Sequence, residues 1–120
     1  MEVLENDYIK LWKEGDIVVG SYKKGAHITL DVAKEVVQMR LEFQKHKKYR
    51  LLVFLNEMTG TAEARQYLAV EGFAGVERLA LIAQSTVTKV LGNFYILVNK
   101  PIVTTKLFSN KVEALRWLQQ

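Results

Sequence analysis

Residues 50–65 of this chain read RLLVFLNEMTGTAEAR, an apolar run that passes through a short polar loop into a helix-forming segment. The run at 51–55 has no polar alternation, which is typical of a strand covered on both faces. We therefore expect an α/β protein in which helices flank a sheet with this strand at its centre. The polar loop follows the carboxyl end of the strand, where ligands and partners usually meet an open α/β sheet.

Length and composition favour one globular domain spanning residues 1–120. A chain of 120 residues can bury one core and is too short for two, and its hydrophobic content of 49% is ordinary for a folded protein. The chain contains no cysteine, which excludes disulfides, thiolate catalysis and cysteine-based metal sites. The composition is compatible with a reducing compartment, and we expect a cytoplasmic protein.

Neither a targeting segment nor a membrane span is expected. The first residues, MEVLENDY, carry acidic side chains before any basic one and have no apolar core, unlike a signal peptide. The longest apolar runs, 51–55 and 79–83, are far shorter than the roughly 20 residues of a spanning helix.

The formal net charge is +4, and much of the excess lies in residues 45–50, KHKKYR. Such a cluster could contact nucleic-acid phosphates or a membrane surface. It also ends a predicted helix, however, where the helix dipole favours cations. We expect a solvated helix end and no nucleic-acid partner.

The N-terminal part predicts an antiparallel hairpin made of residues 8–13 and 16–22, both rich in aromatic and β-branched side chains. In the first run, alternation places Tyr8 and Trp12 on the outer face, so this strand should be half exposed at or near a sheet edge. Exposed aromatic residues often mark an interface, although packing under a neighbouring helix or the chain end would explain them equally well. The strand could also pair with its copy or pack isologously against it, so we consider a homodimer.

The rest of the chain alternates between helix and strand patterns. Helices are expected at about 30–45, 62–71, 86–100 and 111–117, and strands at about 50–55, 76–84 and 102–108. The expected N-caps are Thr29, Thr61, Ser85 or Thr86, and Asn110. Gly72 is expected to close the second helix in a left-handed conformation. The order β-β-α-β-α-β-α-β-α predicts a single mixed sheet with an N-terminal antiparallel hairpin and then mostly parallel strands.

The helix expected at 86–100 is unusually apolar. A broad stripe at helical spacing comprises Val87, Val90, Leu91, Phe94, Leu97 and Val98. Burial on two sides would account for this composition. The alternative is an apolar pocket beneath this third helix, around Phe94, Tyr95 and Leu97, that binds a small ligand or a lipid.

The sequence offers no support for catalysis, for a metal or for a cofactor. It contains no Gly-x-Ser-x-Gly elbow, Walker loop or Gly-x-Gly-x-x-Gly turn. His27 and His46 fall in separate loops and cannot supply a structural zinc site. Glu57 and Glu63 could act as an acid–base pair, but solvated ends of a loop and a helix explain them.

The element order, the N-terminal hairpin, the loop at 55–61 and the closing stretch KLFSNKVEALRWL together resemble the STAS fold of the SpoIIAA-like anti-sigma-factor antagonists. The ending is similar to that of uncharacterised bacterial SpoIIAA-like proteins. The resemblance extends from about residue 8 to 118. It implies an α/β domain of the STAS (SpoIIAA-like) fold and a noncatalytic, regulatory protein-interaction module whose partner is an unknown protein.

In the antagonist family, the loop after the buried strand carries a phosphorylatable Ser or Thr at a helix start. The usual Asp-Ser-Ser-Gly pattern is absent from the matching residues 56–61 here. The resemblance implies a partner-binding loop that comprises Asn56, Glu57, Thr59, Gly60 and Thr61. Thr59 and Thr61 are its phosphoacceptor candidates, and simple capping of the next helix by Thr61 is the competing interpretation.

Overall fold

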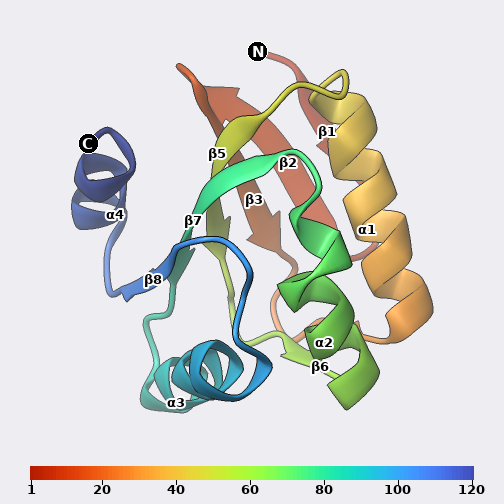
Figure 1. The fold of residues 1–120 in the computed structure, drawn as a ribbon, viewed down its shortest axis with the longest axis vertical. Coiled ribbons are helices and arrows are strands. Elements are labelled where there is room, and N and C mark those ends of the chain that lie inside the picture. The colour runs from red at the N-terminus through yellow and green to blue at the C-terminus, as the bar shows by residue number, and fades with distance from the viewer.

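The computed structural model describes residues 1–120 and contains a six-stranded sheet with helices on both faces (Figure 1). The strands are β1 (Val3–Glu5), β2 (Ile9–Glu14), β3 (Ile17–Tyr22), β4 (His27–Ile28), β5 (Tyr49–Phe54), β6 (Thr59–Gly60), β7 (Val76–Ile82) and β8 (Thr105–Phe108). The helices are α1 (Leu30–Phe43), α2 (Ala62–Ala69), α3 (Thr86–Phe94) and α4 (Lys111–Leu118). A 3₁₀ turn, η1 (Glu71–Phe73), follows α2, and a π-helical turn, η2 (Tyr95–Asn99), extends α3.

The six strands lie in the order β1-β2-β3-β5-β7-β8. The first three are antiparallel, whereas β3, β5, β7 and β8 run parallel to one another. This arrangement confirms the expected mixed sheet. The strand β5 lies between β3 and β7, so the apolar run that opens the sequence is central in the sheet.

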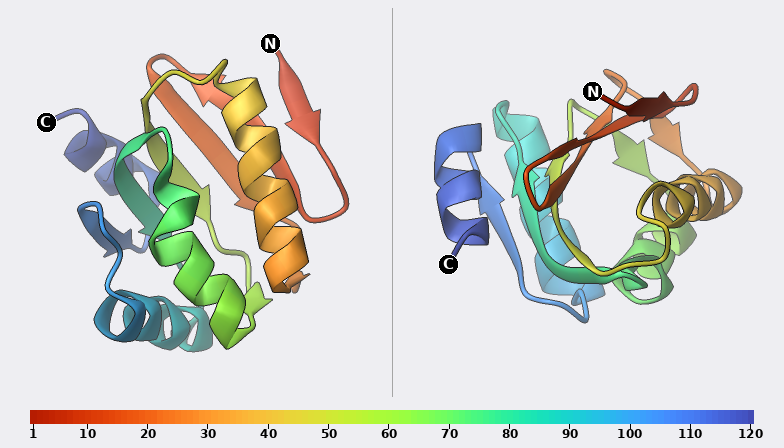
Figure 2. Two further views of the ribbon diagram at one scale, coloured as in Figure 1. Left: turned by 45° about the vertical axis from the view of Figure 1, so that its right-hand side comes forward. Right: turned by 90° about the horizontal axis from the view of Figure 1, so that it is seen from above.

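Both faces of β5 are covered. Leu51 and Val53 belong to a cluster of 17 buried residues, which contains side chains of α1, α2 and η1. Leu52 points to the other face, where a cluster of 7 buried residues includes Ala114 and Leu118 of α4. Figure 2 shows α4 on one side of the sheet and α1 with α2 on the other. The alternation-free apolar sequence is thus explained by burial on both faces.

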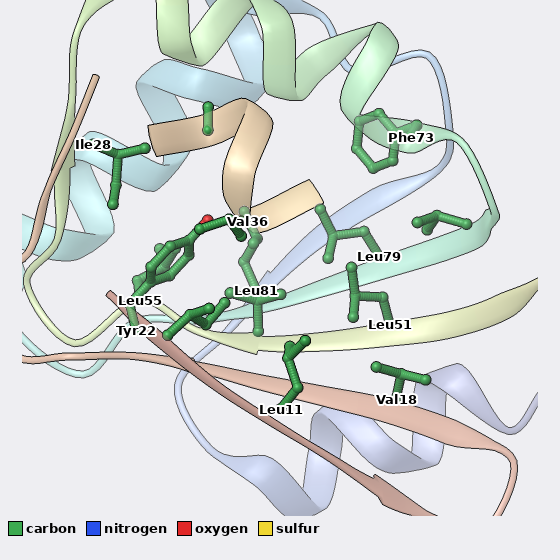
Figure 3. Packing of buried hydrophobic residues seen from close by; sticks show 14 of the residues in the cluster. Leu11, Val18, Tyr22, Ile28, Val36, Leu51, Leu55, Phe73, Leu79 and Leu81 are labelled. Carbon is green, nitrogen blue, oxygen red and sulfur yellow. The ribbon is translucent and has the colours of Figure 1, made fainter. Parts of the chain in front are cut away.

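The larger cluster lies between the sheet and the pair α1 and α2. In Figure 3, Leu11, Leu51 and Leu81 rise from three different strands toward Val36 of α1 and Phe73 of η1. The smaller cluster is covered by α4 alone. The core is therefore thick on one face of the sheet and thin on the other.

Four helix starts follow the local sequence signals. The side chains of Thr29, Thr61, Ser85 and Asn110 each accept a hydrogen bond from the backbone amide three residues later. These side chains satisfy N–H groups that have no partner inside the helix. The expected caps are confirmed, with Ser85 rather than Thr86 at the third helix.

The first strand expected from the sequence, at residues 8–13, corresponds to β2, which lies next to the edge strand and is not itself at the edge. β1, which was not expected, pairs with β2 through Val3 and Trp12, so β2 has a partner on each side. Pairing of residues 8–13 with a second copy, as considered above for a homodimer, is therefore blocked. The free edges of the sheet belong to β1 and β8.

Tyr8 and Trp12 do not form a common outer face. Asn6 Oδ1 accepts hydrogen bonds from the amides of Tyr8 and Ile9, which makes a turn just before β2. Tyr8 consequently packs against the larger cluster, and Trp12 packs against the smaller one. The indole of Trp12 donates to Glu14 Oε2 at 2.8 Å, so it is engaged within the fold.

Three boundary predictions were wrong. α1 ends at Phe43 rather than near residue 45, because Lys45 and His46 adopt left-handed backbone angles (φ 53° and 58°). Gly72 lies in η1, and the left-handed glycine of this region is Gly75 (φ 76°). The last strand covers only Thr105–Phe108 instead of 102–108, because Pro101 and the residues after it turn before they reach the sheet.

Candidate ligand-binding pocket

The apolar stripe of the third helix faces solvent. Val87 is 70% exposed and Leu97 is 74% exposed, and only Thr88 and Gly92 of α3 are buried. α3 lies beyond the ends of the strands, at the foot of Figure 1, where the sheet no longer offers a surface to cover the whole helix. The interpretation of two-sided burial is therefore wrong.

A cavity of about 300 Å³ lies inward of α3, among the sheet, α1, α2 and α3. Of its 24 lining residues, 16 are hydrophobic. Its inner wall includes Leu11, Val53 and Leu81 of the sheet. Its outer wall includes Leu91 and Phe94, which are 42% and 43% exposed and so mark the side open to solvent.

This cavity lies where the sequence suggested an apolar pocket. Phe94 and Tyr95 line it, as expected, whereas Leu97 points to solvent and does not. The hydroxyl of Tyr95 donates to the carbonyl of Leu68 at 3.0 Å, which links η2 to α2 across the pocket wall. Burial raises the pKa of the Tyr95 hydroxyl, so it remains a neutral donor.

Arg40 is the most buried charged residue in the pocket wall, at 4% exposure. Its guanidinium donates to Gln44 Oε1 at 2.6 Å and to the carbonyls of Gly72 and Ala74 at 2.8 and 2.9 Å. The bonds to Gly72 and Ala74 join α1 to η1 and to the residue that follows it. Burial lowers the pKa of Arg40 to about 10, which still leaves the group charged at neutral pH.

Arg65 is a second cation in the wall, on the first turns of α2. Its Nη1 donates to the carbonyl of Gly60 at 2.6 Å. The guanidinium carbon lies 5.3 Å from the centre of the Phe94 ring, a distance typical of a cation–π contact. Arg65 and Phe94 thus meet between α2 and α3, on the open side of the pocket.

The loop residues singled out from the sequence lie together at the carboxyl end of β5. Asn56 and Glu57 both have left-handed backbone angles (φ 46° and 63°), and Asn56 Nδ2 donates to Ser21 Oγ and to the Tyr22 carbonyl, both at 2.9 Å. The next residues form β6, which pairs with β4 in a separate two-stranded parallel sheet. This small sheet was not expected, and it pairs the loop with the residues just before α1.

The two candidate phosphoacceptors differ in their surroundings. Thr61 caps α2, since its Oγ1 accepts from the amide of Ala64 at 3.1 Å. Thr59 is exposed, and its Oγ1 lies 2.9 Å from His27 Nδ1. The capping interpretation of Thr61 is confirmed, and Thr59 is the more accessible hydroxyl.

The remaining candidates from the sequence do not meet in a common site. His27 belongs to β4, while His46 follows α1, and no group of three or more His, Cys, Asp or Glu side chains is placed to hold a metal ion. Glu57 Oε2 lies 3.9 Å from Lys24 Nζ at the surface, and Glu63 is exposed on α2. None of the helices combines the length and the apolar character that are needed to cross a bilayer.

Sequence reasoning missed both arginines of the pocket. A signal for Arg40 was present, because residues 33, 37, 40 and 44 share the inward face of α1 and the last two are Arg and Gln. A charged residue on an otherwise apolar helix face needs a hydrogen-bond or ion-pair partner in the interior. Arg65 gave no such signal, since it lies beside the inward face of a short helix.

Comparison with known proteins assigns the chain to a family. The sequence model described as "Domain of unknown function (DUF7793)" matches residues 11–120. Among curated proteins, nothing matches the chain. A solved structure that is similar is an uncharacterized protein of the DUF3478 family with a SpoIIAA-like fold, from Shewanella loihica PV-4. It shares 15% identity at a TM-score of 0.63, and the match covers 92% of this chain and 91% of that one. The SpoIIAA-like fold expected from the resemblance is therefore confirmed.

Proposed function

The chain belongs to the DUF7793 family, and on that premise we propose that it is a noncatalytic module that binds an apolar small molecule in the pocket beneath α3. The observation that carries this proposal is the cavity of about 300 Å³ with 16 hydrophobic residues among 24 in its lining. Pockets for small molecules have volumes from roughly 300 to 1,000 Å³ and are mostly apolar. Apolar cavities exclude water and accept apolar molecules.

The position of α3 supports entry from solvent. Only Thr88 and Gly92 anchor this helix in the core, and the exposed pair Leu91 and Phe94 forms the outer wall of the pocket. Segments with few buried contacts open at a lower free-energy cost than the central sheet does. A ligand can therefore reach the pocket without disruption of β5.

Filling the pocket should weaken binding of a neutral apolar probe. Val53 faces the cavity from β5, so a Val53→Phe ring would occupy space that the ligand needs. We expect wild-type protein to raise the fluorescence of N-phenyl-1-naphthylamine, and Val53→Phe to bind it at least about tenfold more weakly. Titration of the probe measures both affinities.

The matched control is Val87→Phe, the same substitution on the exposed face of α3 outside the pocket. It should bind the probe like the wild type. Equal binding by a folded Val53→Phe variant would overturn the proposal. If that variant does not fold, Val36→Phe tests the same cavity from α1.

Native mass spectrometry of protein purified from its own host should also show a stable added mass.

The loop at 56–61 supports a second candidate function, a regulatory interaction with a protein partner. Glu57 is exposed at the loop, and the neighbouring Asn56 side chain is fixed by two hydrogen bonds. An exposed, hydrogen-bonded loop at the carboxyl end of a central strand is a suitable recognition surface.

Substitutions in this loop should alter partner capture and leave stability almost unchanged. We expect Glu57→Ala and Thr59→Glu to reduce capture of a partner that wild type retains, with melting temperatures within a few degrees, because both side chains are exposed. Glu63→Ala on α2 is the matched control. A partner that all variants capture equally would rule out the loop as the binding surface.

A further inference from the structure

The pocket wall carries positive charge with no carboxylate to balance it. Arg40 and Arg65 line the cavity, and no Asp or Glu does. The four ion pairs of the structure involve neither arginine. A charge in an apolar environment is costly unless an opposite charge or a full set of hydrogen bonds compensates it. This wall therefore favours a ligand that brings an anionic group.

The two arginines differ in the hydrogen-bonding capacity that they leave free. Arg40 makes three hydrogen bonds of 2.6–2.9 Å, one to Gln44 at the end of α1 and two to carbonyls in and just after η1. Arg65 makes one, to the carbonyl of Gly60, and its Nε is buried without a hydrogen-bond partner. A buried donor without an acceptor is uncommon in folded proteins. Arg65 therefore has a free hydrogen-bond donor, its Nε, for a ligand to accept from.

The position of Arg65 would set the orientation of a bound anionic molecule. Arg65 meets Phe94 on the open side of the pocket, whereas Leu11, Val53 and Leu81 line the inner wall. A molecule with one anionic end and one apolar chain can place its charge at Arg65 and its chain against the sheet. The planar guanidinium matches the two oxygens of a carboxylate.

We propose that the pocket binds an aliphatic carboxylate, with the headgroup on Arg65 and the chain in the apolar cavity. This inference rests on the proposed function, since it requires the pocket to take a ligand. It adds the chemical class of that ligand and the residue that selects it. Arg40 contributes charge to the wall but keeps its structural hydrogen bonds.

Displacement of the neutral probe tests the headgroup separately from the pocket. Dodecanoate, 1-dodecanol and dodecyl phosphate carry the same chain, and each is titrated against bound N-phenyl-1-naphthylamine below its micelle concentration. We expect wild type to bind dodecanoate at least about tenfold more tightly than dodecanol. In Arg65→Met, the affinity for dodecanoate should fall to that for dodecanol, while the affinities for dodecanol and the probe stay unchanged.

Arg116→Met is the matched control, because it removes the same charge from an exposed position on α4. It should keep the wild-type preference for dodecanoate. Arg65→Lys should retain part of that preference, and it replaces Arg65→Met if the latter fails to fold.

The possible failures are distinguishable. Absence of probe binding by the wild-type protein would refute the pocket itself. Normal probe binding with equal displacement by dodecanoate and dodecanol would leave the pocket standing and overturn the anionic headgroup. Dodecyl phosphate that binds at least tenfold more tightly than dodecanoate would overturn the carboxylate assignment in favour of a phosphate. An unchanged preference for dodecanoate over dodecanol in Arg65→Met would show that Arg65 does not bind the headgroup.

Discussion

Leu52→Ala is expected to lower the free energy of unfolding by about 3 to 4 kcal/mol. Leu52 is fully buried in β5, where it lies between Val19 of β3 and Ala80 of β7. Its side chain faces the layer that α4 covers through Ala114 and Leu118. Because α4 is the single helix on that face, truncation leaves a cavity that the neighbours can fill only partly.

Urea denaturation of wild type and variant measures this loss. Leu4→Ala provides the control, because Leu4 lies on the edge strand β1 and is exposed. It should change the free energy of unfolding by less than about 1 kcal/mol. A loss below about 1 kcal/mol for Leu52→Ala as well would mean that the apolar run is not shielded on the face of α4.

Gly75→Val should cost about 3 kcal/mol, for two separate reasons. The backbone of Gly75 is left-handed (φ 76°), a conformation that β-branched residues strongly disfavour. An added Cβ would also lie 3.1 Å from both Gln44 Nε2 and Leu41 Cδ2. Gln44 accepts a hydrogen bond from Arg40, so the clash would also disturb the arginine of the pocket wall.

Gly15→Val separates the cost of the left-handed backbone from the cost of the steric clash. Gly15 is left-handed as well (φ 60°), but nothing lies within 4 Å of an added Cβ there. We expect this control to lose only about 1 to 2 kcal/mol, the cost of the backbone conformation alone. Equal losses for the two variants in chemical denaturation would show that Gly75 has room for a side chain.

The two candidate functions share part of their structure. Thr59 and Gly60 belong to the loop at 56–61, and both also line the pocket. The carbonyl of Gly60 accepts the hydrogen bond of Arg65. A ligand at Arg65 would therefore touch the same segment that a protein partner would bind, so the loop variants should also be assayed for probe binding.

Much of the fold could be predicted because its signals are local. The run at 51–55 lacks alternation, and such a strand is stable only between two layers of helices. The caps at Thr29, Thr61 and Asn110 act on amides three residues away, so the sequence alone is enough to find them. The long connections between strands favoured parallel pairing, and the structure has it.

The errors arise where the pattern of a segment is weak or where segments far apart in the chain meet. β1 has three residues and no strong pattern, and its pairing with β2 supplies its stability. The strands β4 and β6 have two residues each and exist because the loops at 27–28 and 59–60 lie side by side. An apolar helical stripe also cannot reveal whether another layer covers it, and on α3 the stripe is exposed.

The sequence by itself determined an α/β domain with a shielded central strand, because periodicity and capping depend on neighbouring residues. It also suggested where an apolar pocket lies. Only the tertiary structure decided that Arg40 and Arg65 enter the wall of that pocket with no carboxylate beside them. Packing of α1, α2 and α3 around the sheet creates that environment, and the charge balance of a cavity depends on every segment that lines it.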